Sequence, residues 1–442
     1  MGVSTFGGLQ TALRGLLAQQ RSLDVTSHNV ANASTPGYSR QEAVLAASRP
    51  LHIAAGAVQN GGAAELGTGV DVLAYTRARD QFLDLQYRAQ AMRLGGLSAQ
   101  VEGLETVEGA LAEPGENGIS TQLQKFWSDW EDLANAPESQ ATRQALVESA
   151  EGLAASISSL DSQLVTAKEQ AAAEYTSITQ AGGEVEQMAT EIAELNASIR
   201  SSLNSGATPN DLYDKRDLLL DKLSSLAQTS VTDLGNGTIE VDFGDAAVPL
   251  VAETTVTWPQ ALTEPQGKLG TLIELASPTG RIASYREELG AFAQELAESV
   301  NALHMSGGGP AFFSFTAGSA ASTLAVNVSA AEVQTTATGA EGANDIALAI
   351  GALRGGKAES AYSSFVSRVG TDMNNARRAA ENSEVLVNAV QERRESTSGV
   401  SLDEEMTNLV RFQRAYQASA RAMTTFDEAL DTLINRTGRV GL

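Results

Sequence analysis

Apolar residues recur at alternating spacings of three and four near both ends of this 442-residue chain. One repeat runs from Phe6 to Val30 and the other from Leu409 to Leu433. Neither residues 1–35 nor residues 311–442 contain proline, so nothing in them forces a helix to end. The spacing keeps apolar side chains on one side of a helix and favours packing against another helix. We therefore predict a long helix at each end; the second, over residues 402–434, would be roughly 50 Å long.

The apolar members of these repeats are the predicted packing residues. They are Phe6, Leu9, Leu13, Leu16, Leu23 and Val30 in the first repeat and Leu409, Phe412, Tyr416, Met423, Phe426, Leu430 and Leu433 in the second. Gln20 and Ser27 interrupt the first seam, and Ser419 interrupts the second. Polar residues in such a seam set its register at some cost in stability. The pattern alone fits an internal hairpin of two helices as well as packing between separate chains.

The net charge of the chain lies in its middle. The formal charge is −24. Residues 1–45 hold three arginines and two acids, and residues 400–442 hold five arginines and six acids, so these two segments cancel. Near-neutral ends can pack densely against copies of themselves, whereas a charged middle suits a solvated surface. The negative charge disfavours binding to nucleic acid and to anionic membranes.

Composition and pattern together predict a mainly α, elongated, multi-domain protein. Aromatic residues make up only 5% of the chain, which favours long helices over sheet-dominated cores. We expect terminal coiled-coil helices, a long-helix bundle as a shaft and a small inserted β domain. The predicted segments are 1–45 (N-terminal helix, paired with 400–442), 46–230 (first part of the shaft), 231–279 (small β domain), 280–310 (return helix), 311–340 (β segment), 341–399 (last part of the shaft) and 400–442 (C-terminal helix).

Local signals refine this plan. Gly182 and Gly183 predict an interruption in a helix that otherwise runs from residue 146 to about residue 203. Thr208 as N-cap with Pro209 in the first turn predicts the start of a helix that continues through residue 226. The pair Asn236-Gly237 between short alternating runs predicts a two-residue hairpin turn.

The sequence offers no arrangement of residues that suits catalysis or a bound cofactor. It contains no cysteine, which excludes disulfides, thiolate zinc sites and cysteine nucleophiles. His28, His52 and His304 lie in separate segments, without partners at metal-ligand spacing. We therefore predict no catalytic, cofactor-binding or metal residues, and no enzymatic activity. The N-terminus also lacks the apolar stretch of a secretory signal, so export would need another route.

Two segments resemble the flagellar rod, hook and hook-associated axial proteins. The run "HNVANASTPGYSRQ" at residues 28–41 is similar to the family's Asn-rich element, through Asn29, Asn32, Pro36, Gly37 and Tyr38. Pro36 restricts φ and Gly37 accepts positive φ, so the pair should end the helix and turn the chain. The C-terminal "FQRAYQASA" at residues 412–420 resembles the core of the family's matching helix. Residues 67–88, 209–231 and 269–304 and the "FFSF" at 312–315 are similar to segments of hook-associated members.

The resemblance implies a structural adapter at the junction of flagellar hook and filament, required for filament assembly and motility. The implied partners are copies of the chain in a ring, the hook protein, a second junction protein and an export chaperone at the C-terminal helix, with no nucleic acid and no membrane insertion. The implied location is the extracellular flagellum, reached through flagellar type III export. Alternatives are the second junction protein itself, an axial scaffold that carries a cell-wall hydrolase, and a coiled-coil signalling or adhesin protein. The hydrolase needs paired carboxylates or a nucleophile in residues 231–340, and none is visible there.

Overall fold

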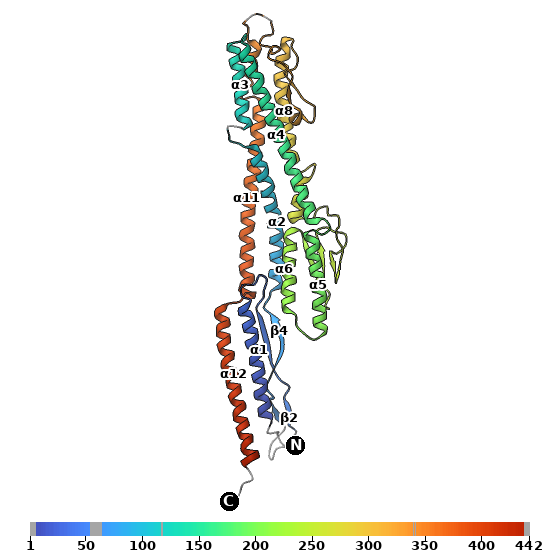
Figure 1. The fold of residues 1–442 in the computed structure, drawn as a ribbon, viewed down its shortest axis with the longest axis vertical. Coiled ribbons are helices and arrows are strands. Elements are labelled where there is room, and N and C mark those ends of the chain that lie inside the picture. The colour runs from blue at the N-terminus through green and yellow to red at the C-terminus, as the bar shows by residue number, and fades with distance from the viewer. Residues whose placement is uncertain (1–5, 54–63, 116–117, 339, 341, 437–442) are drawn as a thin grey trace.

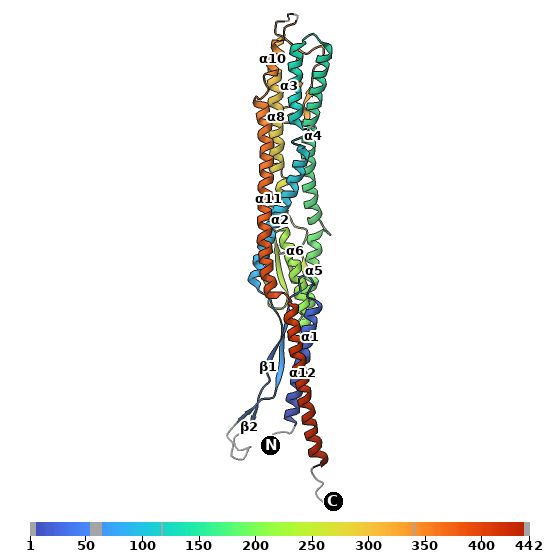
Figure 2. The same cartoon turned by 90° about the vertical axis from the view of Figure 1, so that its left-hand side faces the viewer.

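The protein is a long rod with a narrow lower part. The computed structural model describes residues 6–53, 64–115, 118–338, 340 and 342–436, without the side chains of Ile53, Ala64, Leu433 and Arg436. Figures 1 and 2 show a helical shaft that continues at one end into a pair of helices and a strand hairpin. We call this lower end the axial part and the boundary between the two the waist. The mainly α, elongated fold predicted from the sequence is confirmed.

The axial part contains the first and last helices and a ribbon of strands. It consists of α1 (Gly7–Ala31), β1 (Gln41–Ala47), β2 (Leu51–Ile53), β3 (Ala64–Leu66), β4 (Val70–Arg77), α12 (Leu402–Asp431) and a π-helical turn, Thr432–Arg436. Strand β1 pairs antiparallel with β4, and β2 with β3. The prediction of a helical shaft from residue 46 is therefore wrong as far as Arg77. Among its described residues the ribbon has no strands beyond these pairs and buries little, so its apolar residues do not alternate as they would over a core.

The shaft is a bundle of long helices. It is built from α2 (Gln81–Leu111), α3 (Ile119–Asn135), α4 (Gln140–Thr179), α5 (Glu184–Asn204), α6 (Asn210–Leu226), α7 (Gly267–Ala276), α8 (Arg281–His304), α10 (Asp345–Gly351) and α11 (Lys357–Ser398). Helix α11 runs down the shaft along α2 and returns the chain to the waist. The buried residues of the connected apolar core of the shaft lie between Leu104 and Ala376 in the sequence.

The β regions are smaller than predicted. Strands β5 (Thr229–Asp233), β6 (Ile239–Phe243), β7 (Val251–Ala252) and β8 (Thr255–Val256) form an antiparallel sheet in that order. Residues 267–276, placed in the β domain by the sequence analysis, form helix α7. Residues 305–326 form a 3-10 turn (Met305–Gly307), a one-turn helix α9 (Ala320–Thr323) and two short paired strands, β9 (Phe313–Ser314) and β10 (Ala325–Val326).

Two local predictions need correction. The β5–β6 hairpin does not have a two-residue turn: Leu234 N–H donates to the Thr238 carbonyl, leaving three residues in the loop, and Gly235 and Gly237 both have positive φ. Helix α6 begins one residue later than predicted, with Pro209 at the N-cap position and no capping side chain. The predicted end of α6 at Leu226 and the break at Gly182-Gly183 are confirmed.

A cluster of aromatic rings fills the upper end of the shaft. Trp130 is fully buried, with its ring centroid 5.4 Å from that of Phe312 and 6.4 Å from that of His304. His304 is also fully buried, with Nδ1 2.8 Å from the Pro310 carbonyl. Its Nε2 accepts a hydrogen bond from the backbone N–H of Gln334 at 2.9 Å, so the imidazole is neutral with its proton on Nδ1.

This histidine should make the stability of the rod depend on pH. Burial lowers the pKa of His304 below its ordinary value, against the opposing hydrogen bond to Pro310. The unfolded chain therefore takes up a proton that the folded chain refuses, and the free energy of unfolding should fall as pH drops below about 6.5. Urea titrations between pH 8 and pH 5 measure this. His304→Gln should show a flatter dependence over the same range, and an equal slope in both proteins would contradict the assignment.

Candidate assembly surface at the paired terminal helices

Helices α1 and α12 pack side by side within one chain, through small residues of α1. A Cβ atom built on Gly8 would lie 2.5 Å from Cε1 of Phe426, and one on Gly15 would lie 3.3 Å from Oγ of Ser419. Small residues let the two helix axes approach closely. The internal pair, one of the two arrangements that fit the heptads, is present within this chain.

The contact uses a register one residue earlier than the predicted seam of α1. The side chains of α1 that are buried are Ala12, Ala18, Ser22, Thr26 and Asn29. Together with Gly8 and Gly15, four of these five follow the same three-and-four spacing as the apolar seam, one residue ahead of it. The spacing of apolar residues alone does not reveal these positions. The signal was present as a repeat of Gly, Ala, Ser and Thr.

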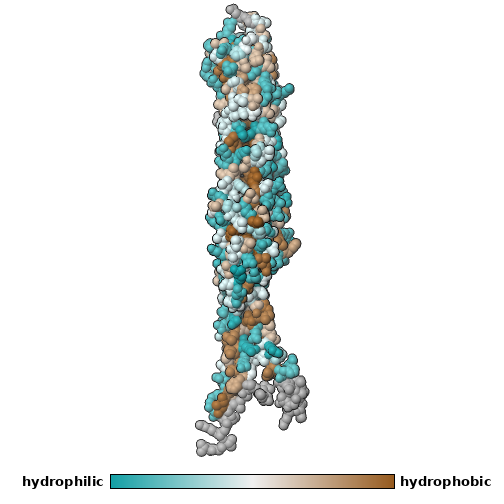
Figure 3. All heavy atoms as spheres, turned by 90° about the vertical axis from the view of Figure 1, so that its right-hand side faces the viewer, coloured by the Kyte–Doolittle hydropathy of each residue, from teal (hydrophilic) through white to brown (hydrophobic). Residues whose placement is uncertain are grey.

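The predicted seam residues are consequently only partly covered. Phe6, Leu13 and Phe426 are exposed, with 52%, 43% and 40% of their surface accessible. Half-buried are Leu9, Leu16, Leu23, Val30, Leu409, Phe412, Tyr416, Met423 and Leu430, and the side chain of Leu433 lies outside the described part. Leu17, which the prediction omitted, is 46% exposed beside Leu13. Figure 3 shows apolar side chains gathered over the narrow lower part.

The turn that follows α1 is tied by one asparagine. The Asn29 side chain donates to the Gln41 carbonyl at 2.9 Å and accepts from the Gln41 N–H at 3.0 Å. Its Oδ1 also accepts from the Tyr38 hydroxyl at 2.8 Å. Burial, followed by the charge of Asp211, raises the pKa of Tyr38, so the hydroxyl remains a donor. These bonds fasten the end of α1 to the start of β1.

Other predicted residues of this turn have simpler roles. Asn32 Nδ2 donates to the His28 carbonyl at 3.0 Å at the end of the helix. Gly37 has φ +78°, as predicted for a residue that turns the chain, and Pro36 before it is exposed. The helix itself ends at Ala31, before the Pro36-Gly37 pair rather than at it.

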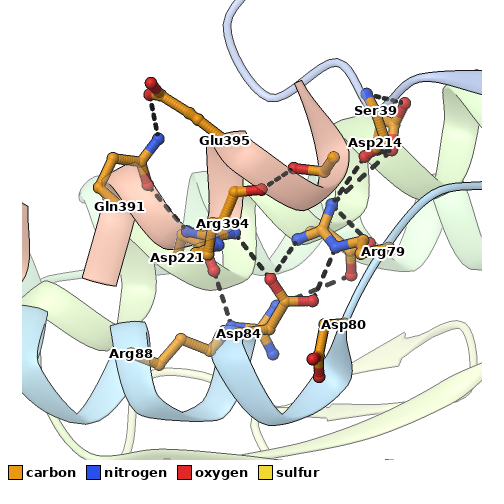
Figure 4. Close-up of polar contacts among 12 residues, drawn as sticks. Ser39, Arg79, Asp80, Asp84, Arg88, Asp214, Asp221, Gln391, Arg394 and Glu395 are labelled. Carbon is orange, nitrogen blue, oxygen red and sulfur yellow. Dashed lines mark hydrogen bonds and ion pairs between the residues drawn. The ribbon is translucent and has the colours of Figure 1, made fainter. Parts of the chain in front are cut away.

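At the waist, basic side chains meet a row of acids on α6 (Figure 4). Asp214 accepts hydrogen bonds from Ser39 N–H at 2.9 Å, Ser39 Oγ at 2.8 Å and Arg77 Nη1 at 2.8 Å. Asp217 pairs with Arg77 at 2.9 Å and with Arg79 at 3.2 Å. This cluster has no local signal in the sequence, because its members come from separate segments.

The cluster continues up the shaft. Asp221 of α6 binds Arg88 of α2 at 2.7 Å and Arg394 of α11 at 2.8 Å. Asp84 of α2 completes it, binding Arg79 at 2.7 Å and Arg394 at 2.9 Å. Four arginines thus face four aspartates, and the cluster is neutral overall.

The charges of the cluster stabilise one another. Burial would raise the pKa of Asp217, but Arg79 and Arg77 outweigh it and hold the pKa below its ordinary value. Burial would likewise lower the pKa of Arg79, yet Asp217 and Asp84 raise it. Asp217 and Arg79 are therefore both ionised at neutral pH. Removing one partner would leave an uncompensated charge in a largely buried place.

The described residues contain no group of three or more His, Asp or Glu side chains that could hold a metal ion. None of the helices formed by the described residues is long and apolar enough to cross a membrane.

Known protein families match both ends and the shaft. Residues 9–38 match the family model of the flagella basal body rod protein, and residues 391–436 match that of the flagellar basal body rod FlgEFG protein C-terminal region. Residues 104–266 match the flagellar hook-associated protein FlgK helical domain.

Individual flagellar proteins are also similar to this chain. Flagellar hook-associated protein 1 of Salmonella typhimurium is 29% identical over 67% of this chain, which spans 56% of that protein. The flagellar hook junction protein FlgK of Burkholderia pseudomallei aligns in structure over 52% of this chain and 46% of its own, with 24% identity and a TM-score of 0.45. Flagellar hook-associated protein 1 of Bacillus subtilis is 30% identical over 98% of this chain and 99% of its own length, and this chain therefore belongs to the flagellar hook-associated protein 1 family.

Proposed function

We propose that this chain is a structural adapter between the flagellar hook and the filament, required for filament assembly and motility. It acts by packing, without catalysis, as a ring of identical subunits. Its partners are further copies of the chain, the hook protein and a second junction protein. It reaches the extracellular flagellum through the flagellar type III export route, with a chaperone bound to its C-terminal helix.

The observation that carries this proposal is the division of α1 into two faces. One face is small and buried against α12 and the strand ribbon. The other presents Leu13 and Leu17, each more than two-fifths exposed. Adjacent exposed apolar residues on a rod commonly mark a contact with another protein. The near-neutral charge of both terminal segments allows many copies of this surface to crowd together.

Burial of Leu13 and Leu17 between subunits would stabilise the assembled ring. Burying a leucine side chain that is partly exposed in the free subunit contributes about 1 kcal/mol or more per residue. Repeated around a ring, such contributions add for every subunit, whereas they add nothing to the stability of the isolated chain. Assembly and folding should therefore respond differently to the same substitution.

Replacing Leu13 and Leu17 by serine should abolish the junction and leave the subunit folded. In solution the double variant should unfold within about 1 kcal/mol of the wild type, because both side chains are already half in water. In cells that express it, hooks should lack filaments and flagellin should accumulate in the medium. Electron microscopy of the cells and quantification of both secreted proteins measure this.

The matched control is Val385→Ser with Leu386→Ser, on the exposed face of α11 in the shaft. It removes similar apolar surface away from α1 and should leave filaments attached. Filaments of normal number and length on cells with the Leu13 and Leu17 variant would refute the proposal. If the variant were not secreted, purified protein added to hooks would decide the same question.

A further inference from the structure

We propose that the waist is an orientational joint: charge pairs along α6, with no apolar core, hold the axial part at its angle to the shaft. The axial part would turn as one body when these pairs are removed. This inference concerns the isolated subunit and does not depend on the proposed function.

Few covalent connections cross the waist. The chain passes from β4 to α2 at residues 78–80, and from α11 to α12 at residues 399–401. Two backbone hydrogen bonds reinforce these crossings: Arg40 N–H donates to the Ser398 carbonyl and Ala78 N–H to the Arg40 carbonyl, both at 2.8 Å. Two connecting segments and two backbone hydrogen bonds leave the axial part free to rotate relative to the shaft.

The apolar core does not continue through the waist. Its buried members begin at Leu104 and end at Ala376, and no described residue of the axial part belongs to it. A shared core would have fixed the angle by close packing, because packed side chains do not slide continuously. Other contacts must therefore set the orientation.

Polar residues of α6 provide those contacts, at a helical spacing of three. Asn210 donates to Gln41 Oε1 at 3.1 Å, and Asp211 accepts from Gln41 Nε2 at 2.7 Å. Asp214 binds Ser39 and Arg77, and Asp217 binds Arg77 and Arg79, at the distances given above. Residues three apart lie on one side of a helix, so α6 presents a ladder along which the axial part is fastened.

The pairing within the ladder is shared rather than one to one. Arg77 reaches both Asp214 and Asp217 through the same nitrogen, Nη1. Arg79 reaches Asp84, Asp214 and Asp217. A small rotation can therefore exchange one carboxylate for the next without leaving an arginine unpaired. Buried charges must stay paired, and the shared carboxylates keep both arginines paired as the axial part turns.

Space for such a movement lies beside the ladder. A groove of about 1000 Å³ separates the Ala33–Arg40 turn from the end of α11 and the start of α12. Leu218 of α6 and Tyr87 of α2 line its floor, and the turn on its rim is largely exposed. The groove leaves part of the boundary between the axial part and the shaft unpacked.

Distances between spin labels test the joint in the full chain. The chain has no cysteine, so Asn382→Cys on α11 and Gln417→Cys on α12 give a single exposed pair across the waist. The pair Glu102→Cys with Asn382→Cys reports on the shaft alone, and Gln20→Cys with Gln417→Cys on the axial part alone. In otherwise wild-type protein all three distance distributions should be narrow.

Removing the ladder should change only the distance across the waist. With Asp214→Asn and Asp217→Asn, the 382–417 distribution should broaden and shift, while the other two stay unchanged. Asp161→Asn is the matched control, because it removes a carboxylate that binds Arg286 inside the shaft at 2.9 Å. It should alter none of the three distributions.

The aspartate substitutions could also disturb α6 itself, and a second variant separates this effect from the loss of the charge pairs. Ser39→Ala with Arg77→Gln removes partners on the axial side and leaves every α6 residue in place. It too should broaden the 382–417 distribution alone. An unchanged 382–417 distribution in either variant, with the shaft pair still narrow, would overturn the proposal. A broad 20–417 distribution in the otherwise wild-type protein would also overturn it, because the axial part would not be one body.

Discussion

Replacing Gly95 by alanine is expected to destabilise the shaft by about 3 kcal/mol, the upper part of the usual range for overpacking. A Cβ at this position of α2 would collide with the backbone carbonyl oxygen of Ser225, where α6 ends. The next residue is also closely packed, since a Cβ on Gly96 would lie 3.0 Å from the Gly267 carbonyl oxygen of α7. Backbone atoms cannot turn aside as a side chain does, so the helices must separate.

Gly109 of the same helix is the control. No atom lies within 4 Å of a Cβ built there, so Gly109→Ala should stabilise the protein by about 1 kcal/mol through helix propensity alone. Urea unfolding followed by circular dichroism measures both variants. Equal shifts in the two midpoints would mean that α2 does not approach α6 and α7 as closely as the structure shows.

Trp130→Ala should cost about 4 kcal/mol, as large-to-small changes in aromatic cores do. The ring is fully buried and packs against Phe126, Phe312 and His304. Its loss would open a cavity where α3 meets the segment after α8, and the rest of the cluster is too tightly held to fill it.

Two further substitutions separate the causes of this loss. The Trp130 indole Nε1 has no hydrogen-bond partner among the described residues, so Trp130→Phe should cost far less than the alanine change. Leu348→Ala on α10, where the side chain is 54% exposed, should change stability by less than about 0.5 kcal/mol. A loss at Trp130→Phe as large as that at Trp130→Ala would show that the indole nitrogen is bonded after all.

The helices were the part of this fold that the sequence could predict. Helix α12 starts at Leu402, as expected, because Ser401 before it caps the helix and three acids fill its first turn. The break at Gly182-Gly183 and the end of α6 follow from equally local signals. Such features depend on residues within one or two turns, which a single sequence displays directly.

The axial strands were missed for a physical reason. Strand β4 exposes Leu73, at 73%, and in the part of the chain that the structure describes it pairs with β1 alone, so no buried face imposes an alternating pattern. The face by which α1 meets α12 was missed because close helix contacts select small side chains, which carry no hydrophobic signal. The α6 ladder depends on Ser39 and Gln41 after α1 and on Arg77 and Arg79 at the end of the strand ribbon, and nothing in one sequence places those segments beside α6.

The pairing of α1 with α12 also constrains the order in which the chain can fold. This contact joins the first helix to the last, so it has almost the largest sequence separation available to the chain. Closing so long a loop in an unfolded chain is entropically costly and slow. A folded shaft removes most of that cost, because α2 and α11 then hold the two ends side by side at the waist. The shaft should therefore fold first, and the axial part should form only after the last residues of α12 are free to join it.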